Sequence, residues 1–404
     1  MKHLQTMLRR ISSLWTRHAL PSDVEDWQSL IGKAEALLTD SDYDRGAVIA
    51  KKALGIAECT KHPEHPDVAT CLDTLARIYW KQRHYGEAER LHQRAIAIRK
   101  TACGPSHPLV AASLNNLAVI YANQGRYTEA EHLNKCALEI REKCLGTEHM
   151  AVAVSLSNLG LLYGETGQYA KAEAMCVRAL AIVEDSRGPD SADVSVILNN
   201  LAGVYESQQR YVEAESLYER ARSILEKTLG PEHPEVARIV SNLAVLYEGR
   251  GQHTEAQELF RRAIAIRYRV LGPEHPDLAT SLKNLGGCYE NQGLYTDAEG
   301  LYKRAAEICE ESLGPNHIDV ARSLSSLAAC YKSQGRYSEA ESLFKRSAEI
   351  FEESLGPNHI DVASALTSLG LLYTFGGRYA EGAPLLDRAI AIRKAVAGTE
   401  QNDN

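Results

Sequence analysis

The sequence lacks the features that would place the protein in a membrane, in the secretory pathway or on nucleic acid. No apolar run approaches the roughly 18 residues that a membrane span needs. The first residues lack the apolar segment and cleavage site of a secretory signal. Positive charge is not in excess, since 45 Lys and Arg residues face 53 Asp and Glu residues. Nucleic acid requires a basic face, so we expect protein or peptide partners instead.

Paired cysteines and catalytic motifs are missing as well. The nine cysteines are odd in number and irregularly spaced, unlike those of a disulfide-stabilised domain, and we expect a reducing, cytoplasmic compartment. There is no phosphate-binding glycine loop, nucleophile elbow or zinc-protease motif. We therefore predict a protein that is not an enzyme and holds no cofactor. The enzyme alternative would require a deep pocket with converging titratable groups.

What the sequence does contain is a 42-residue repeat, and internal repeats decide the fold wherever they occur. Tyrosines keep this step without insertion or deletion, at Tyr79, Tyr121, Tyr163, Tyr205, Tyr247, Tyr289, Tyr331 and Tyr373. Gly-Pro pairs in one register begin at Gly104, Gly188, Gly230, Gly272, Gly314 and Gly356, with Gly146-Thr147 filling the gap. A degenerate unit begins at Trp27, which makes nine units.

Each unit has the pattern of two amphipathic helices joined by a turn. In the unit from Ala111, an apolar stripe at the i, i+3, i+4, i+7 spacing of a helix face is followed by a turn at Gly125 and a second stripe. The glycine that ends each unit suits a helix C-terminus, and the proline after it prevents continuation. One hairpin cannot bury its apolar face alone, so the units must stack.

This pattern resembles the tetratricopeptide repeat over residues 27–398. The family's two helix-contact alanines are matched at Ala88, Ala130, Ala172, Ala214, Ala256, Ala298 and Ala340, and at Ala95, Ala137, Ala179, Ala221, Ala263, Ala305 and Ala389. The 42-residue length resembles the kinesin light chain variety. The resemblance implies an all-α fold, a right-handed superhelical solenoid of stacked helical hairpins.

We expect four segments. Residues 1–26 would form a basic amphipathic helix that caps the solenoid. The alternatives are contact of residues 1–20 with a membrane surface and a role as a targeting segment. Residues 27–68 are the degenerate first repeat, residues 69–398 hold eight repeats, and residues 399–404 form a disordered tail. The last repeat has Gly382 in place of a contact alanine and Pro384 inside its second helix, which predicts an atypical end.

One slot of the first helix, opposite the apolar stripe, repeatedly holds asparagine. Asparagine is not preferred inside helices, but its amide both donates and accepts hydrogen bonds, as an extended peptide backbone requires. The resemblance implies that this face lines a concave groove and that the asparagines contact peptide. The alternative is that they bond a neighbouring repeat. The candidates are Asn116, Asn158, Asn200, Asn242 and Asn284.

Other residues of this face differ between repeats, as specificity determinants would, although a solvated helix face is the alternative. Three basic side chains join the peptide-binding candidates: Arg238, Lys283 and Arg322. Acidic and apolar residues on the same face include Glu165, Glu206, Glu248, Glu290, Leu161, Leu371 and Phe375. The predicted function is a protein–protein interaction scaffold or adaptor that binds extended peptides in its groove. The alternatives are a regulatory peptide sensor whose superhelix changes shape, and a kinesin light chain-like cargo adaptor.

Histidines recur once per repeat before the first helix, at His65, His107, His149, His233, His275, His317 and His359. Successive histidines lie a repeat apart, too far to share a metal ion, so we predict that they cap helices. Ser191 takes this position in one repeat and would also cap. The irregular cluster Cys59, His62, His65 and Cys71 matches no familiar metal-site spacing, and we expect no metal there.

Replacing all five candidate asparagines by alanine should abolish capture of the proteins that the groove binds. The comparison is a quantitative pull-down with crosslinking and mass spectrometry, between wild type and a variant of unchanged helicity. Partners retained equally by both would contradict peptide contact by the asparagines. They would move the interface to the convex face or to the N-terminal segment.

Overall fold

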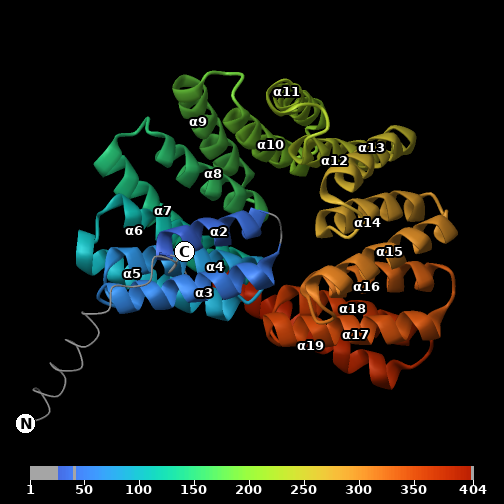
Figure 1. The fold of residues 1–404 in the computed structure, drawn as a ribbon. Helices are drawn as coiled ribbons and strands as arrows, with labels where there is room; N and C mark the ends of the chain where they lie inside the picture. Colours follow the sequence, from blue (N-terminus) through green and yellow to red (C-terminus); the bar gives the residue numbers. More distant parts are fainter. Residues whose placement is uncertain (1–25, 40–41, 402–404) are drawn as a thin grey trace, which may run out of the picture.

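The computed structural model describes residues 26–39 and 42–401, which form eighteen α-helices and no β-strand. The helices alternate as the first and second members of nine hairpins (Figure 1). The first helices are α2 (Trp27–Thr39), α4 (Pro66–Lys81), α6 (Pro108–Asn123), α8 (Met150–Glu165), α10 (Ala192–Ser207), α12 (Pro234–Gly249), α14 (Pro276–Asn291), α16 (Ile318–Ser333) and α18 (Ile360–Phe375). The second helices are α3 (Tyr43–Thr60), α5 (Tyr85–Cys103), α7 (Tyr127–Leu145), α9 (Tyr169–Arg187), α11 (Tyr211–Leu229), α13 (His253–Leu271), α15 (Tyr295–Leu313), α17 (Tyr337–Leu355) and α19 (Tyr379–Gln401).

The two predicted end segments lie partly or wholly outside this description. Residues 1–25, on which the predicted N-terminal cap falls, are outside the described residues. Of the predicted tail, residues 399–401 are helical and residues 402–404 are outside the described residues. Pro384 lies inside α19. None of the helices in the described part of the chain combines the length and the apolar composition that a membrane span requires.

The recurring histidines start the first helices, as predicted. In seven repeats the histidine Nδ1 accepts the N–H of the residue two positions on, at 3.1–3.2 Å, which satisfies one of the free donors of a helix N-terminus. The expectation for Ser191 is wrong. Its side chain makes no capping hydrogen bond, and its hydroxyl is buried without a partner among the described residues. From the same backbone position, the short hydroxyl does not reach the N–H that an imidazole reaches.

The turns inside the hairpins depend on a left-handed residue. Gly125 and its equivalents adopt φ of 73–78°, a region that costs an ordinary residue about 1–2 kcal/mol. Two repeats place other residues there, Arg83 at φ 62° and Gln209 at φ 60°. Arg83 and Gln209 thus carry a backbone strain that glycine would avoid.

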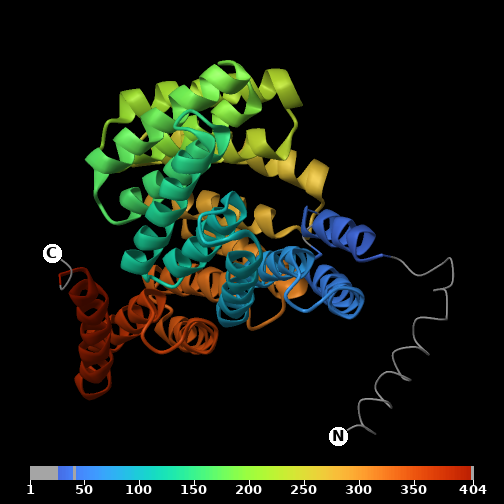
Figure 2. The same cartoon turned by 90° about the vertical axis from the view of Figure 1, so that its left-hand side faces the viewer.

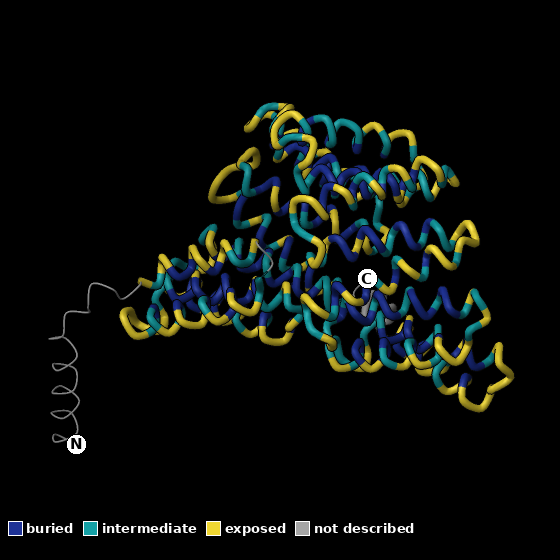
Figure 3. The backbone as a smooth tube through the Cα atoms, turned by 45° about the vertical axis from the view of Figure 1, so that its right-hand side comes forward, coloured by how far each residue is buried: buried dark blue, intermediate teal, exposed yellow. Residues whose placement is uncertain are grey.

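The core is a continuous band between the two helix layers (Figure 3). Every predicted contact alanine is buried, at an exposure of 2% or less. The last hairpin packs still more closely, since a Cβ at Gly382 would lie 2.8 Å from the carbonyl oxygen of Gly370. Only glycine fits there, which explains why the contact alanine is missing. The last helix, red in Figure 2, lies at one edge of the molecule.

The repeating tyrosine joins neighbouring repeats by a polar contact as well as by packing. The hydroxyl of Tyr205 donates to Glu173 in the preceding repeat at 3.0 Å, and Arg210 contacts the same carboxylate at 3.0 Å. Similar pairs bring Tyr121 and Arg126 to Glu89, Tyr247 and Arg250 to Glu215, and Tyr373 and Arg378 to Glu341. These contacts fix the angle at which one hairpin follows the next.

The second repeat contains a buried charged cluster around Asp73. Its carboxylate contacts the Arg99 guanidinium, and His92 Nδ1 lies 2.8 Å from Asp73 Oδ1. Burial alone would raise the pKa of Asp73, but His92 and Arg99 hold that pKa below its ordinary value of 3.8. In the next repeat, 42 positions on, Asn115 replaces Asp73 and Arg141 bonds Ser155 at 2.8 Å instead.

Asp73→Ala should lower the free energy of unfolding by about 3–5 kcal/mol, because it leaves the buried Arg99 unpaired. Asn115→Ala is the matched control and should cost about 1 kcal/mol. Since the folded-state pKa of Asp73 is depressed, its contribution is present above pH 3.8 and is lost as the pH falls through the folded-state pKa. Chemical denaturation at neutral and acidic pH measures both effects. Equal losses in the two variants would contradict this account.

Candidate peptide-binding groove

The first helices line the inner side of the curved stack and the second helices its outer side (Figure 1). Along the inner side, α8, α10 and α12 form a cavity of about 330 Å³. Its lining includes Leu161, Glu165, Asn199, Asn200, Glu206, Tyr218, Asn242 and Val245. An adjoining hollow shares Glu206 and Val245 and extends to Glu248. We call this surface the central groove.

Two carboxylates of the central groove have no neutralising partner. Burial raises the pKa of the Glu165 carboxyl, and no cationic side chain in the described part of the chain pairs with it. Burial also raises the pKa of Glu206, whose Oε2 accepts the Tyr218 hydroxyl at 3.1 Å. Glu165 is exposed and Glu206 is partly buried, and neither carboxylate is paired with a cation that would offset the cost of its desolvation.

Apolar side chains stand beside these carboxylates. Leu161 is 45% exposed and Val245 is 40% exposed, although both belong to helices whose other faces are packed. The central groove therefore combines negative charge with an accessible aliphatic surface. This arrangement suits a ligand that has a cationic group close to an apolar one.

The central groove brings together two of the five candidate asparagines. The Nδ2 amide of Asn200 donates to Ser157 Oγ at 2.9 Å, and that of Asn242 donates to Asn199 Oδ1 at 2.6 Å. Both bonds cross to the preceding repeat, as the alternative interpretation of the asparagines expected. Asn116, Asn158 and Asn284 are half-buried and lie outside this cavity.

The three basic candidates lie apart from the central groove and are engaged elsewhere. Arg238 pairs with Glu235 at 2.8 Å, and Arg322 lies 3.3 Å from Asp319 and 3.1 Å from Asp361. Lys283 is half-buried, and burial lowers its pKa. Lys283 and Arg322 line a different cavity, of about 300 Å³, together with residues of the second repeat.

That second cavity exists because the chain curls until its last repeats return beside its first ones (Figure 1). The Arg83 guanidinium lies 3.6 Å from the Asp319 carboxylate. Leu355 packs against the apolar residues of α4, α5 and α6, and His359 Nε2 lies 3.2 Å from the Asn123 carbonyl oxygen. Since His359 Nδ1 accepts the N–H of Asp361, its Nε2 carries the proton and donates. We call Arg83, Asn123, Asp319, Leu355 and His359 the cross-turn contact.

The cross-turn contact covers part of the face that the sequence assigned to peptide. Trp80, Lys81 and Arg83 stand opposite Lys283 and Arg322 across the second cavity. The residue of this contact that departs from the repeat is Arg83, which stands in a slot where most repeats have glycine. The cluster Cys59, His62, His65 and Cys71 forms no group of metal-ligand spacing within the described residues, and His65 caps α4.

Comparison with known proteins identifies the repeat. Models of the tetratricopeptide repeat match residues 68–109 and, in six overlapping spans, residues between 109 and 395. No curated protein matches the sequence.

Several solved structures are similar to this chain, over different fractions of its length. Nearly identical TPR-like repeats from Podosopora anserina, assigned as a kinesin light chain, are 28% identical, cover 51% of this chain and 96% of their own, and give a TM-score of 0.42. A Rap protein complexed with competence and sporulation factor is 14% identical, covers 92% of this chain and 99% of its own, and gives a TM-score of 0.59. Aspartyl phosphate phosphatase F from Bacillus subtilis is 13% identical, covers 93% and 97%, and gives a TM-score of 0.53.

The fold is therefore an all-α solenoid of stacked hairpins, as the sequence predicted. The family models cover well over half of the chain. The chain belongs to the tetratricopeptide-repeat family, with a repeat of 42 residues, and is a protein-interaction scaffold.

Proposed function

We propose that the scaffold binds an extended peptide along the central groove, and that a lysine or arginine of the peptide lies between Glu165 and Glu206. The observation that carries this proposal is the pair of carboxylates that line one cavity without a cationic partner among the described residues, Glu165 at its exposed side and Glu206 partly buried. A half-buried charge costs free energy unless an opposite charge compensates it. A cationic side chain from a ligand supplies that compensation.

The other lining residues suit the rest of such a peptide. Leu161 and Val245 offer aliphatic surface on either side of the carboxylates. Three first helices packed at roughly 8–10 Å span about five or six residues of extended chain at ~3.3 Å each. The side-chain amides of Asn199, Asn200 and Asn242 lie along the cavity wall, and at least one oxygen or N–H among them is available to a peptide backbone.

Binding without catalysis and a cytoplasmic location complete the proposal. Tetratricopeptide scaffolds are generally non-enzymatic. The odd and irregular cysteines suit a reducing compartment. The nine thiols are free.

Selection from a randomised peptide library on the purified protein should enrich sequences in which Lys or Arg neighbours an aliphatic residue. Glu165→Gln combined with Glu206→Gln should weaken a selected peptide at least about tenfold, which corresponds to ~1.4 kcal/mol, and should reduce the dependence of binding on salt. Fluorescence anisotropy measures both. The matched control is Glu258→Gln with Glu349→Gln, an equal charge change at exposed positions of the outer helices α13 and α17. Selected peptides without a basic residue, or equal affinity in both double variants, would contradict the proposal.

The cross-turn contact favours a second candidate function, a sensor whose superhelix changes shape. In the described part of the chain, the ion pair, the hydrogen bond and the Leu355 packing of the cross-turn contact join the second and third repeats to the eighth and ninth, while consecutive hairpins are joined by apolar interfaces. A ligand that prefers an opened or a tightened stack would shift this equilibrium by its difference in affinity for the two shapes.

Arg83→Gly should increase the radius of gyration without loss of helicity. The change removes the ion pair to Asp319, while glycine adopts the left-handed backbone at this position without strain. Gln209→Gly is the matched control, because Gln209 has the same conformation and is exposed, and its radius should not change. Small-angle X-ray scattering compares the two. Equal radii for Arg83→Gly and wild type, also when Leu355→Ser is added, would show that the contact does not hold the stack closed.

A further inference from the structure

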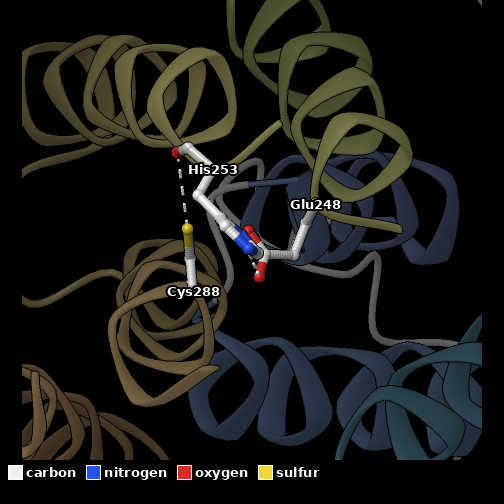
Figure 4. A group of neighbouring side chains, drawn as sticks. All are labelled: Glu248, His253 and Cys288. Carbon is white, nitrogen blue, oxygen red and sulfur yellow. Dashed lines mark hydrogen bonds and ion pairs between the residues drawn. The ribbon is translucent and has the colours of Figure 1, made fainter. Parts of the chain in front are cut away.

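We propose that Glu248, His253 and Cys288 form a binding site for one divalent cation of the zinc type. The three side chains converge from the end of α12, the start of α13 and the body of α14 (Figure 4). One potential ligand atom from each lies within 4.8 Å of the other two. No other group of three His, Cys, Asp or Glu side chains has this spacing in the described part of the chain.

The contacts of the three side chains leave room for an ion. His253 Nδ1 lies 3.0 Å from Glu248 Oε1, which also accepts the Asn291 amide at 3.0 Å. The other carboxylate oxygen, Glu248 Oε2, is buried and makes no well-aligned hydrogen bond with the described residues, although the Cys288 thiol lies beside this carboxylate. Cys288 Sγ lies 3.7 Å from the His253 carbonyl oxygen. A buried oxygen without a good hydrogen bond lowers the stability of the folded protein. A cation between the three groups would give this oxygen a partner.

The ligand set and its burial fit zinc. Imidazole nitrogen, thiolate sulfur and carboxylate oxygen bind Zn²⁺ at about 2.0–2.3 Å, so a tetrahedral site places its ligand atoms roughly 3.3–3.8 Å apart. The present separations need side-chain shifts of about 1 Å to reach that geometry. The side chain of His253 is 36% exposed and that of Glu248 is 16% exposed, while Cys288 is 1% exposed. An ion can thus enter from the imidazole side, with water as a fourth ligand.

When the cation binds, its ligand side chains release protons to the solvent in exchange. The ion takes the place between His253 Nδ1 and Glu248. Nδ1 gives up to solvent the proton that it donates to Glu248 Oε1, and the bound imidazole is neutral with its one proton on Nε2. The Cys288 sulfur forms a bond to the metal, and its thiol proton leaves to solvent. No oxidant or reductant takes part.

The repeat itself provides a comparison that isolates His253. In the next repeat, Glu290, Tyr295 and Cys330 occupy the equivalent positions. Cys330 Sγ lies 3.4 Å from the Tyr295 carbonyl oxygen, just as Cys288 lies against that of His253. Gln334 and Gln292 donate to the two sulfurs at the same distance, 3.4 Å. The environment of the thiol is therefore common to both repeats, and the imidazole is what distinguishes the proposed site.

Tyrosine is the residue that begins every other second helix, at Tyr43, Tyr85, Tyr127, Tyr169, Tyr211, Tyr295, Tyr337 and Tyr379. His253→Tyr therefore restores the usual residue of the repeat and should leave the fold intact. This variant also keeps all nine cysteines. Any adventitious binding of metal to thiols remains the same in wild type and variant.

The experiment is a titration of the reduced, metal-free full chain with Co²⁺, followed by competition with Zn²⁺. Wild type should bind one equivalent, with the sulfur-to-cobalt charge-transfer band and the visible bands of a tetrahedral site. Zn²⁺ should displace the cobalt and raise the melting temperature. His253→Tyr, Cys288→Ala and Glu248→Gln should each weaken binding by more than about 100-fold, the upper end of what loss of an outer-shell partner alone costs.

Cys330→Ala is the matched control and should bind as wild type does. Absence of a one-equivalent cobalt spectrum in wild type would overturn the proposal. So would binding by His253→Tyr with wild-type affinity, because the metal would then sit on thiols elsewhere. The outcome is independent of peptide binding, since the assay contains no peptide.

Discussion

The buried alanines at the helix contacts set the geometry on which the rest of the molecule depends. Because each has almost no exposed surface, a small side chain lies between neighbouring helices in each repeat that has one, and the 42-residue step without insertions repeats a similar rotation along the chain. Similar rotations add up to a smooth curve. The curve has two consequences: the first helices share one inner surface, and the last repeats return to meet the first.

Local structure could be predicted from the sequence because each signal acts within one repeat. A histidine before the first helix, a glycine after the second and the spacing of apolar residues each constrain a few neighbouring positions, and the helices at Pro108–Asn123 and Tyr127–Leu145 follow from them. The tyrosine hydroxyls were harder to assign, because their partner Glu173 or Glu215 lies 32 positions earlier. Ser191 shows that a residue type with a general capping preference fails where the loop is built for a longer side chain.

The candidate site could be predicted only in part, since two of its features depend on accumulated curvature. The inner face and its asparagines follow from helix periodicity, but the meeting of Arg83 with Asp319 depends on the sum of many small rotations. Lys283 and Arg322 therefore line a cavity together with residues of the second repeat, a neighbourhood that helix periodicity alone does not predict. Arg210 shows the contrast, because its partner Glu173 of the preceding repeat is a paired carboxylate. The two acids of the central groove differ, because no cationic side chain of the described residues pairs with them.

Departures from the repeat mark the positions where one unit does something that its neighbours do not. Arg83 occupies a glycine slot at a cost in backbone strain, Asp73 places a buried charge where the next repeat has an amide, and His253 replaces a tyrosine. Duplicated repeats have the same sequence at first. Neutral substitutions on exposed surfaces then make them differ without creating new contacts. These three differ, because each makes a specific polar contact that its counterparts do not make. In a solenoid, the exceptions that acquire new partners are thus a better guide to function than the consensus, which describes only how the hairpins stack.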